Sequence, residues 1–339
     1  MASTNTSVIV FGSTGAIGTS LIELLSKEHP DWQIKAVTRS ISSKSRLAEM
    51  GIENVTMVEG DPFSKEDVLS LTKDCEKIYC CVGFHKYETK YWAVNWPLVV
   101  DNLLAATVAG DQKRQLIFCD NLYAYGPGSN ISEKTPTIPP SLKTKPAIRS
   151  MLRQNMLEHM KAHPGTLTVI GAADFFGPHL TETSLLGDLT TGKIMAGESP
   201  MALCSASVIH DFCFAPDFAK AMAIASVSEK AYDKFWICPH SVHGKTMTEI
   251  ANDIAKVVNG NKAPEKPVKV TALPAFALAI LGVFQTLMAE LYQMRNFWNS
   301  DYTIDDSSFR REFGVEATPY DEALDSVVGF YRQNQKVEK

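Results

Sequence analysis

Short runs of apolar residues alternate with longer stretches of helical spacing through the first half of the chain. The apolar runs are SVIVFG (7–12), WQIKAVTR (32–39), VTMVEGD (55–61), KIYCCVG (77–83), QLIFCDN (115–121) and TLTVIGAAD (166–174). We expect these runs to be strands, with helices after the first run, at 96–110 and near 146–163. Strands that alternate with helices form right-handed βαβ units. The pattern therefore predicts an α/β fold with a parallel sheet.

The second half of the chain is patterned less regularly. Residues 126–142 and 196–207 are predicted to be loops, and FWICP (235–239) is predicted to be a strand. MTEIANDIAKVVNG (247–260) is predicted to be a helix. The segment YDEALDSVVGFYRQN (320–334) has an apolar stripe at helical spacing, which is typical of an amphipathic helix.

One apolar stretch has to be weighed against a membrane. Residues 272–289 read ALPAFALAILGVFQTLMA, a length near the lower limit for a helix that spans a bilayer. Pro274, Gly282 and Gln285 interrupt the stretch, and Glu290 follows it. We therefore expect a buried or substrate-lining helix, with an interfacial or membrane helix as the alternative.

Composition and charge narrow the class of protein. The chain has 339 residues, of which 45% are hydrophobic and 21% charged, so a disordered or low-complexity protein is excluded. A net charge of −5 does not attract nucleic acid. The seven cysteines form no CxxC pair or zinc-type cluster, so we expect buried thiols and no metal. Because the first residues do not resemble a signal peptide, the expected location is cytoplasmic.

A glycine-rich segment directly follows the first predicted strand and opens the first predicted helix. It reads Gly12-Ser13-Thr14-Gly15-Ala16-Ile17-Gly18. Gly12 permits a tight turn, Gly15 lets the backbone approach a pyrophosphate, and Gly18 lets the helix pack closely on the sheet. The N-terminus of the helix offers free N–H groups to the phosphates. This strand–turn–helix context predicts a dinucleotide site.

The GxxGxxG spacing resembles that of the short-chain dehydrogenase/reductase superfamily in its extended, epimerase/dehydratase-like form. Further matches are Asp61 with Pro62, Val82 with Gly83, Asn95, Tyr125-Gly126-Pro127, and the turn from Asp174 to Pro178. The resemblance implies that Asp61 contacts the adenine and that Val82 and Gly83 lie on the nicotinamide side.

The same resemblance implies a division of the chain. A Rossmann-type, doubly wound parallel sheet would occupy a dinucleotide-binding domain at 1–180. A smaller C-terminal substrate-binding region would occupy 181–339 and would be interleaved with the Rossmann core, for example at 208–240.

The residues after the second strand bear on which dinucleotide is bound. An acid there would bind the ribose of NAD, but the sequence reads Val37-Thr38-Arg39-Ser40, with Lys44 and Arg46 close behind. Arg39 can pair with a 2′-phosphate, and Ser40 lies beside it. The sequence therefore predicts NADP rather than NAD, although Arg39 also fits an ordinary surface charge.

The superfamily's usual Tyr-x-x-x-Lys pair is missing. The best alignment places Lys145 at the tyrosine position and Arg149 at the lysine position, with Lys143 as another candidate. Asn121 aligns with the serine of the family's catalytic set. These departures put ordinary alcohol dehydrogenase chemistry in doubt and place the chain among the atypical members.

Two tyrosines could replace the missing proton donor. Tyr123 and Tyr125 follow the fifth strand at the edge where open α/β sheets bind ligands. Lys145 or Lys143 would supply a positive field, Asn121 would bind a carbonyl oxygen or a cofactor ribose, and Arg149 would clamp a carboxylate or phosphate. Packing roles for both tyrosines, and a solvated helix face for Lys145 and Arg149, remain alternatives.

Aromatic residues indicate the kind of substrate. Phe84, Tyr87 and Trp92 follow the fourth strand, and Phe175 follows the sixth. Together they predict a largely apolar pocket and a bulky, apolar substrate. Asp174 would bind a substrate hydroxyl or orient a base, or would serve as a turn cap.

Three functions remain open at this point. The first is an NADP-dependent oxidoreductase that reduces a carbonyl or an activated C=C bond of a medium-sized, mostly apolar metabolite. The second is an epimerase, dehydratase, isomerase or cyclase on the same scaffold, and the third is an NADP-binding sensor. We expect a small-molecule substrate, no nucleic acid, no membrane partner, and a monomer or homodimer.

Overall fold

The computed structural model describes residues 6–41 and 46–337, which form two compact units. The first unit holds the described residues up to Ala124, together with Ile138–Gly171 and Phe218–Cys238. The second unit holds Tyr125–Thr137, Ala172–Asp217 and the described residues from Pro239 onwards. The chain therefore passes between the units several times.

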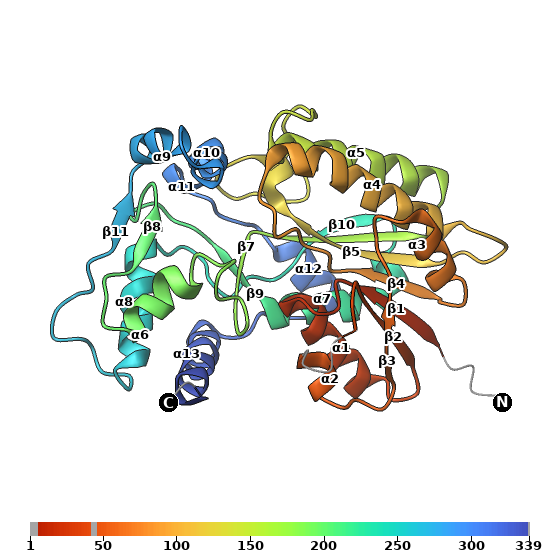
Figure 1. The fold of residues 1–339 in the computed structure, drawn as a ribbon, viewed down its shortest axis with the longest axis horizontal. Coiled ribbons are helices and arrows are strands. Elements are labelled where there is room, and N and C mark those ends of the chain that lie inside the picture. The colour runs from red at the N-terminus through yellow and green to blue at the C-terminus, as the bar shows by residue number, and fades with distance from the viewer. Residues whose placement is uncertain (1–5, 42–45, 338–339) are drawn as a thin grey trace. The chain divides into compact units, whose positions relative to one another are not determined.

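The first unit is built on a seven-stranded sheet (Figure 1). Its strands are β1 (Ser7–Phe11), β2 (Gln33–Thr38), β3 (Val55–Glu59), β4 (Lys77–Cys80), β5 (Gln115–Asn121), β6 (Leu167–Ala172) and β10 (Lys234–Ile237). They run in the order β10-β6-β5-β4-β1-β2-β3 and pair in parallel. This order confirms the predicted Rossmann-type, doubly wound sheet.

Helices cover both faces of this sheet. They are α1 (Ala16–Glu28), α2 (Arg46–Glu49), α3 (Lys65–Thr72), α4 (Thr89–Thr107), α5 (Lys145–Ala162) and most of α7 (Ala215–Ser226), with 3-10 turns at Leu122–Tyr125 and Glu229–Ala231. Figure 1 shows α3, α4 and α5 on one face and α1 and α7 on the other. One apolar core lies beneath α3, α4 and α5, where Phe11, Ile78 and Phe118 are fully buried.

Local sequence explains where these helices begin. Ser64 accepts a hydrogen bond from the Asp67 N–H and so caps α3, and Thr144 caps α5 in the same way. Pro146 lies in the first turn of α5, where its missing N–H costs nothing. Helix α4 begins at Thr89, earlier than the predicted 96–110, and contains Pro97 in its interior.

The second unit has small sheets and many short helices. Its strands are β7 (Asp174–Phe176) paired with β9 (Phe212–Phe214), and β8 (Met201–Leu203) paired with β11 (Thr271–Leu273). Its helices are a π-helical turn (Gly187–Gly192), α6 (Lys193–Met195), α8 (Met247–Val258), α9 (Ala275–Gly282), α10 (Thr286–Gln293), α11 (Arg295–Asn299), α12 (Ser307–Phe313) and α13 (Tyr320–Val337). The apolar faces of α8 and α13 supply much of its core.

Two expectations for this unit are wrong. Residues 196–207 are not a loop throughout, because they contain β8. Residues 272–289 do not form one buried helix: they contain the end of β11, α9 and the start of α10, and Leu278 is the one residue of α9 that is buried. None of the described helices is both long enough and apolar enough to cross a membrane.

Candidate cofactor and active site

The glycine turn between β1 and α1 is held in place by close backbone contacts. Gly12 has φ +78°, and a Cβ built on it would lie 2.4 Å from the Cys81 carbonyl oxygen at the end of β4. A Cβ on Gly18 would lie 2.2 Å from the Gly12 carbonyl oxygen. The buried Ser13 hydroxyl donates to the Val37 carbonyl at 2.7 Å and ties the turn to β2. Side chains are therefore excluded at Gly12 and Gly18 by the fold itself.

Gly15 differs from its neighbours because nothing in the fold excludes a side chain there. It is exposed, its φ is −76°, and a built Cβ would meet only the Gly12 carbonyl oxygen, at 3.5 Å. Gly15 is also the N-cap of α1, and no side chain caps that helix. The first turn of α1, which begins at Ala16 and Ile17, thus keeps N–H groups available for an anion, with Thr14 exposed beside it. These features fit a dinucleotide pyrophosphate.

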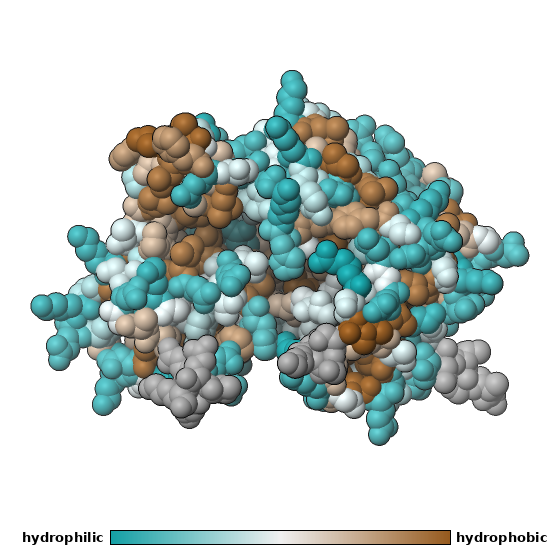
Figure 2. Space-filling model, in the orientation of Figure 1, coloured by the Kyte–Doolittle hydropathy of each residue, from teal (hydrophilic) through white to brown (hydrophobic). Residues whose placement is uncertain are grey.

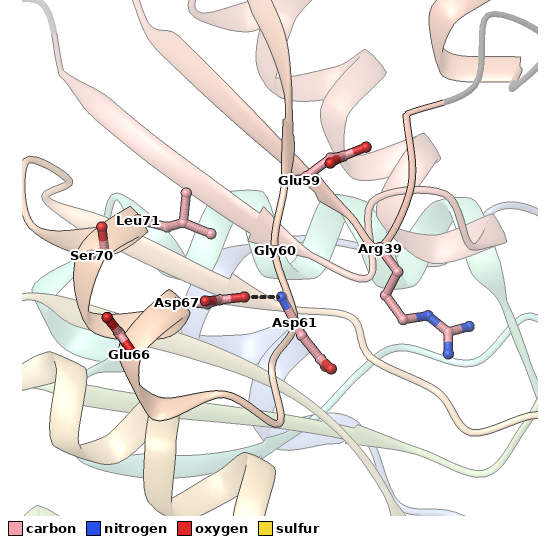
Figure 3. Close-up of a pocket in the computed structure, with 8 residues that line it drawn as sticks. All are labelled: Arg39, Glu59, Gly60, Asp61, Glu66, Asp67, Ser70 and Leu71. Carbon is pink, nitrogen blue, oxygen red and sulfur yellow. Dashed lines mark hydrogen bonds between the residues drawn. The ribbon is translucent and has the colours of Figure 1, made fainter.

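The end of β2 offers a positive charge next to a hollow. Arg39 is exposed and, within the described part of the chain, makes no ion pair. Figure 3 shows its side chain extending alongside Asp61, at a hollow of about 540 Å³ that also contains Asp67. Arg46 is instead paired with Glu23. Lys44 lies outside the described residues.

The remaining predicted cofactor residues follow β2, β3 and β4 at the same edge of the sheet. Asp61 accepts a hydrogen bond from the Phe63 N–H, and its own N–H donates to Asp67. Pro62 is buried beside Asp61, whereas Ser40 and Gly83 are exposed and Val82 is half-buried. The carboxyl edge of a parallel sheet is where open α/β folds bind ligands. The structure thus brings the predicted cofactor residues to one edge.

A buried ion pair joins β5 to α5. The Arg149 guanidinium donates to Asp120 Oδ1 at 3.0 Å and stacks on the Trp96 ring, 3.7 Å from its centroid. Burial raises the pKa of Asp120 and lowers the pKa of Arg149, and each partner opposes the shift of the other. Arg149 Nε has no hydrogen-bond partner among the described residues. Arg149 therefore does not lie on a solvated helix face.

Tyr123 lies near this pair. Burial lowers the pKa of Arg149; of the groups that oppose this shift, Asp120 has the largest effect and Tyr123 the smallest. The Tyr123 N–H donates to the Asn121 side chain at 3.1 Å, and both residues are half-buried. Tyr125 is buried two residues further along the same 3-10 turn and belongs to the second unit. The two tyrosines thus have different surroundings.

Lys145 is completely buried at the start of α5. Its Nζ lies 4.1 Å from the centroid of the Tyr87 ring, a cation–π contact. Tyr87 packs edge-on against Trp92, and Phe84 packs against Trp96. Phe84 and Tyr87 remain half-buried, whereas Trp92 is buried. Lys143 is exposed.

Asp174 and Phe175 belong to the second unit. The Asp174 carboxylate lies 2.9 Å from His210 Nε2, and His210 is buried. The side chains of Asp174 and Phe175 are both partly exposed. His210 also lines a small cavity with Trp298, whose indole N–H has no partner among the described residues. Asp174 and His210 lie 36 residues apart, and no spacing in the sequence indicated their contact.

Comparison with known proteins decides the class of the nucleotide site. Residues 12–175 match the family described as NAD(P)H-binding. These residues are therefore similar to known NAD(P)H-binding domains. No curated protein matches the chain by sequence.

Several solved structures are similar to this chain over nearly its whole length. The dTDP-glucose 4,6-dehydratase of Bacillus anthracis in complex with NAD has 14% identity, covers 98% of each chain and gives a TM-score of 0.76. The UDP-glucuronic acid 4-epimerase of Bacillus cereus with UDP-glucuronic acid and NAD has 13% identity, covers 97% of this chain and 100% of its own, and gives 0.77. The UDP-glucose 4-epimerase of Thermotoga maritima has 16% identity, the same coverage, and 0.74.

These matches confirm the predicted resemblance at the level of the fold, and the family match lies where the dinucleotide-binding domain was predicted. Identity is low throughout, so the likeness to these structures carries the fold and not their substrates. The residues at the Tyr-x-x-x-Lys positions of this chain, Lys145 and Arg149, still have to be understood from their own surroundings.

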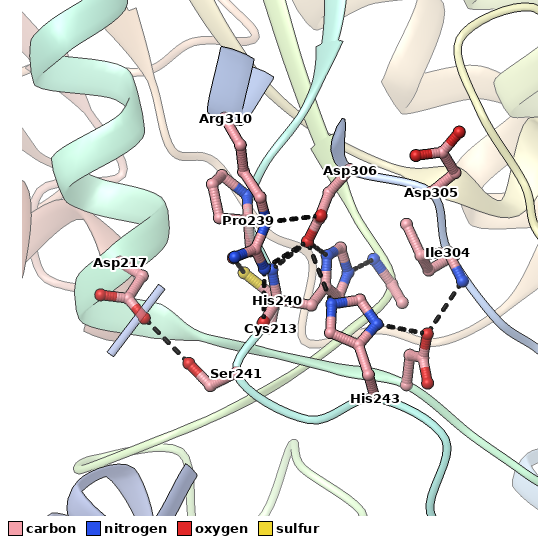
Figure 4. Close-up of polar contacts among 12 residues, drawn as sticks. Cys213, Asp217, Pro239, His240, Ser241, His243, Ile304, Asp305, Asp306 and Arg310 are labelled. Carbon is pink, nitrogen blue, oxygen red and sulfur yellow. Dashed lines mark hydrogen bonds and ion pairs between the residues drawn. The ribbon is translucent and has the colours of Figure 1, made fainter. Parts of the chain in front are cut away.

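A polar network that sequence patterns did not indicate lies beyond the NAD(P)H-binding domain, in the second unit (Figure 4). His243 bridges two carboxylates, with Nδ1 2.9 Å from Asp211 and Nε2 3.1 Å from Asp306. Asp306 also accepts from the His240 N–H at 2.6 Å and from Arg310.

The charges in this network support one another. Burial would lower the pKa of His243, but the hydrogen bonds to Asp211 and Asp306 raise it to about 9. Burial also opposes ionisation of Asp306, yet hydrogen bonds from His240, His243 and Arg310 hold its pKa well below the usual range. The network therefore fastens the segment before α12 to the turn that follows β10.

Proposed function

We propose that the protein is an NADP(H)-dependent oxidoreductase that reduces a carbonyl or an activated C=C bond of a medium-sized, mostly apolar substrate. Arg39 supports the choice of NADP, because it is an exposed guanidinium that forms no ion pair with any described residue, at the position where NAD enzymes have an acid. The open Gly15 and the uncapped α1 would hold the pyrophosphate. When bound, the dinucleotide supplies the hydride.

The observation that carries the proposal is the neighbourhood of Tyr123. Tyr123 lies in the 3-10 turn that directly follows β5, and the buried Arg149 is paired with Asp120 of that strand. Tyr123 would donate its phenolic proton to the substrate oxygen. Arg149 would stabilise the resulting phenolate, as the lysine of a Tyr-x-x-x-Lys pair does. Asn121, whose side chain accepts from the Tyr123 N–H, would help to orient this turn.

Lys145 is proposed to act without touching the substrate. Its ammonium has no exposed surface and lies against the Tyr87 ring. We propose that its positive charge acts on the reacting oxygen at a distance, through the electrostatic potential of the site. Phe84 and Tyr87 keep part of their rings exposed and would form the apolar wall beside the nicotinamide. We keep Asp174 and Phe175, in the second unit, as proposed substrate contacts.

A second candidate is an epimerase, dehydratase or related enzyme in which hydride returns to the substrate. The solved structures that share the fold include enzymes of this kind. The absence of a Tyr-x-x-x-Lys pair argues against simple alcohol oxidation, but it does not distinguish a reductase from an epimerase or dehydratase. A sensor of NADP is the third candidate, but in a sensor Tyr123 and Arg149 would have no catalytic role.

The deciding experiment supplies NADPH that is deuterated at C4 together with a panel of apolar ketones, enones and aldehydes. We expect one NADPH to be consumed for each product molecule, with the deuterium in the product. A product formed without net loss of NADPH would instead identify the epimerase or dehydratase class. Tight NADPH binding with no product from any compound would favour the sensor.

Variants of the two tyrosines test the proton donor in the same assay. Tyr123→Phe should lower kcat at least about 100-fold, because general acid catalysis typically contributes that much, while NADPH binding stays unchanged. Tyr125→Phe is the matched control and should retain most of the activity. The reverse result would move the role to Tyr125, and full activity in both would move it to water.

A further inference from the structure

Two short helices of the second unit form a hairpin that is distinct from the nucleotide site. Helices α9 and α10 pack against each other, and a Cβ built on Gly282 would lie 2.8 Å from the Ala289 Cα. Small residues therefore let the two backbones approach closely. The hairpin is held together by its own contacts rather than by a deep core, because no residue of α10 is buried.

The surface of this hairpin is unusually apolar. Residues 270–289 contain no Asp, Glu, Lys or Arg. Phe276 is 69% exposed, Ile280 60%, Val283 77% and Phe284 82%. Figure 2 shows a cluster of hydrophobic residues at the place of α9 and α10 in Figure 1. The exposed area of these side chains is on the order of several hundred Å², which is at the upper end for a monomer and marks an interaction site.

The chemistry of α9 selects the kind of partner. Ala275–Gly282 has no polar side chain on any face, and Leu278 is its only buried residue. A second copy of the chain would cover one face of such a helix. A helix that is apolar all round needs an apolar medium around it, either a protein core or lipid.

The tip of the hairpin is prepared for a medium without water. The N–H groups of Val283, Phe284 and Gln285 donate to carbonyl groups of the last turn of α9, at 3.2, 3.0 and 2.9 Å. Backbone donors must be satisfied internally where water is excluded. The two most exposed large apolar side chains of the described chain, those of Val283 and Phe284, project from this same turn.

We propose that the α9–α10 hairpin docks on a lipid surface, with Val283 and Phe284 entering the boundary between headgroups and acyl chains. Each helix has 8 residues, or about 12 Å of length, which suits shallow insertion and not spanning. The polar side chain of Gln285 lies at the same tip and would face the headgroups.

The far end of α10 fits the same arrangement. The Arg295 guanidinium stacks on the Tyr292 ring, 4.2 Å from its centroid, and donates to the Tyr292 carbonyl. Tyrosine and arginine are typical of the polar side of a membrane interface. Because the protein has a net charge of −5, the proposed surface is an uncharged one, held by apolar contact.

Flotation of the full-length protein with phosphatidylcholine vesicles tests the proposal. We expect the wild type to float with the vesicles, and the double variant Val283→Asp/Phe284→Asp to lose at least about tenfold of the bound fraction. Val227→Asp is the matched control, since Val227 is 55% exposed and lies outside the hairpin, and it should float like the wild type. NADPH binding, measured in parallel, should be equal in all three proteins.

Three results would overturn the proposal. The first is a wild type that stays with the unbound protein. The second is a double variant that floats as well as the wild type. The third is a wild type that ignores vesicles but dimerises, with the dimer lost in the double variant, which would assign the hairpin to a second copy. None of these results depends on the proposed reaction, because the assay contains no substrate.

Discussion

Single glycines in the nucleotide turn have different physical tasks. Gly12 and Gly18 are required by the fold, since a Cβ on either would collide with a carbonyl oxygen. Gly15 has ordinary backbone angles and open space around it, so the fold does not require a glycine there, and we propose that a bound dinucleotide does. The spacing in the sequence predicted all three glycines, but only the structure separates the two tasks.

The Gly15→Val variant should therefore fold normally and fail to bind the dinucleotide. We expect its Tm to stay within about 2 °C of the wild type and its Kd for NADPH to rise at least about 100-fold, because the side chain would occupy the path of the pyrophosphate. Gly18→Val is the control and should lose stability first. Titration by NADPH fluorescence and thermal unfolding measure both. Normal NADPH binding by Gly15→Val would contradict the assignment.

Charge neutralisation at Arg39 tests which dinucleotide is preferred. Arg39→Gln should weaken NADPH binding by about 10- to 100-fold, the value of a charge-assisted hydrogen bond, and leave NADH binding nearly unchanged. Arg46→Gln removes the same charge from a side chain already paired with Glu23 and should change neither affinity much. If Arg39→Gln weakens the two dinucleotides equally, Arg39 does not recognise the 2′-phosphate.

At the scale of elements, a buried ion pair joins a strand and a helix that lie far apart in the sequence. Asp120 is the last residue but one of β5, and Arg149 lies in α5. The two form a buried ion pair, and removing either partner would cost about 3–5 kcal/mol of stability. An Arg149 variant would therefore report on stability as well as on catalysis. For this reason the tyrosines are the sharper test of the proton donor.

The network around His243 predicts a pH dependence of stability. Its pKa is raised from 6.5 to about 9 in the folded protein. Its stabilising effect is therefore complete below pH 6.5 and is lost as the pH rises through 9. We expect the Tm of the wild type to fall by a few degrees over this interval.

Thermal unfolding at several pH values checks this expectation. His243→Gln should have a lower Tm than the wild type at neutral pH and a flatter profile in the alkaline range. His85→Gln, at an exposed histidine, is the control and should follow the wild-type profile. Parallel profiles for His243→Gln and the wild type would show that the bridge between Asp211 and Asp306 contributes little.

At the scale of the whole molecule, the sequence predicts repeating local structure well and long-range contacts poorly. QLIFCDN at 115–121 matches β5, because a strand buried on both faces is a continuous apolar run. The Asp211–His243–Asp306 bridge joins three distant segments that share no spacing, so no pattern could indicate it. The prediction for the hairpin of α9 and α10 was wrong for another reason. An apolar run was expected to be buried, but much of it is exposed.

The passage of the chain between the two units has a consequence for synthesis. Strand β10, which completes the sheet of the first unit, and most of helix α7 come from Phe218–Cys238, after two stretches of the second unit have been made. The buried Tyr79 hydroxyl of β4 donates to Ser226 of α7. On the ribosome, β6 is therefore the edge strand of the nascent sheet, and it lacks its partner β10 until residue 238 has emerged. Competence to bind the dinucleotide should therefore arise late in translation.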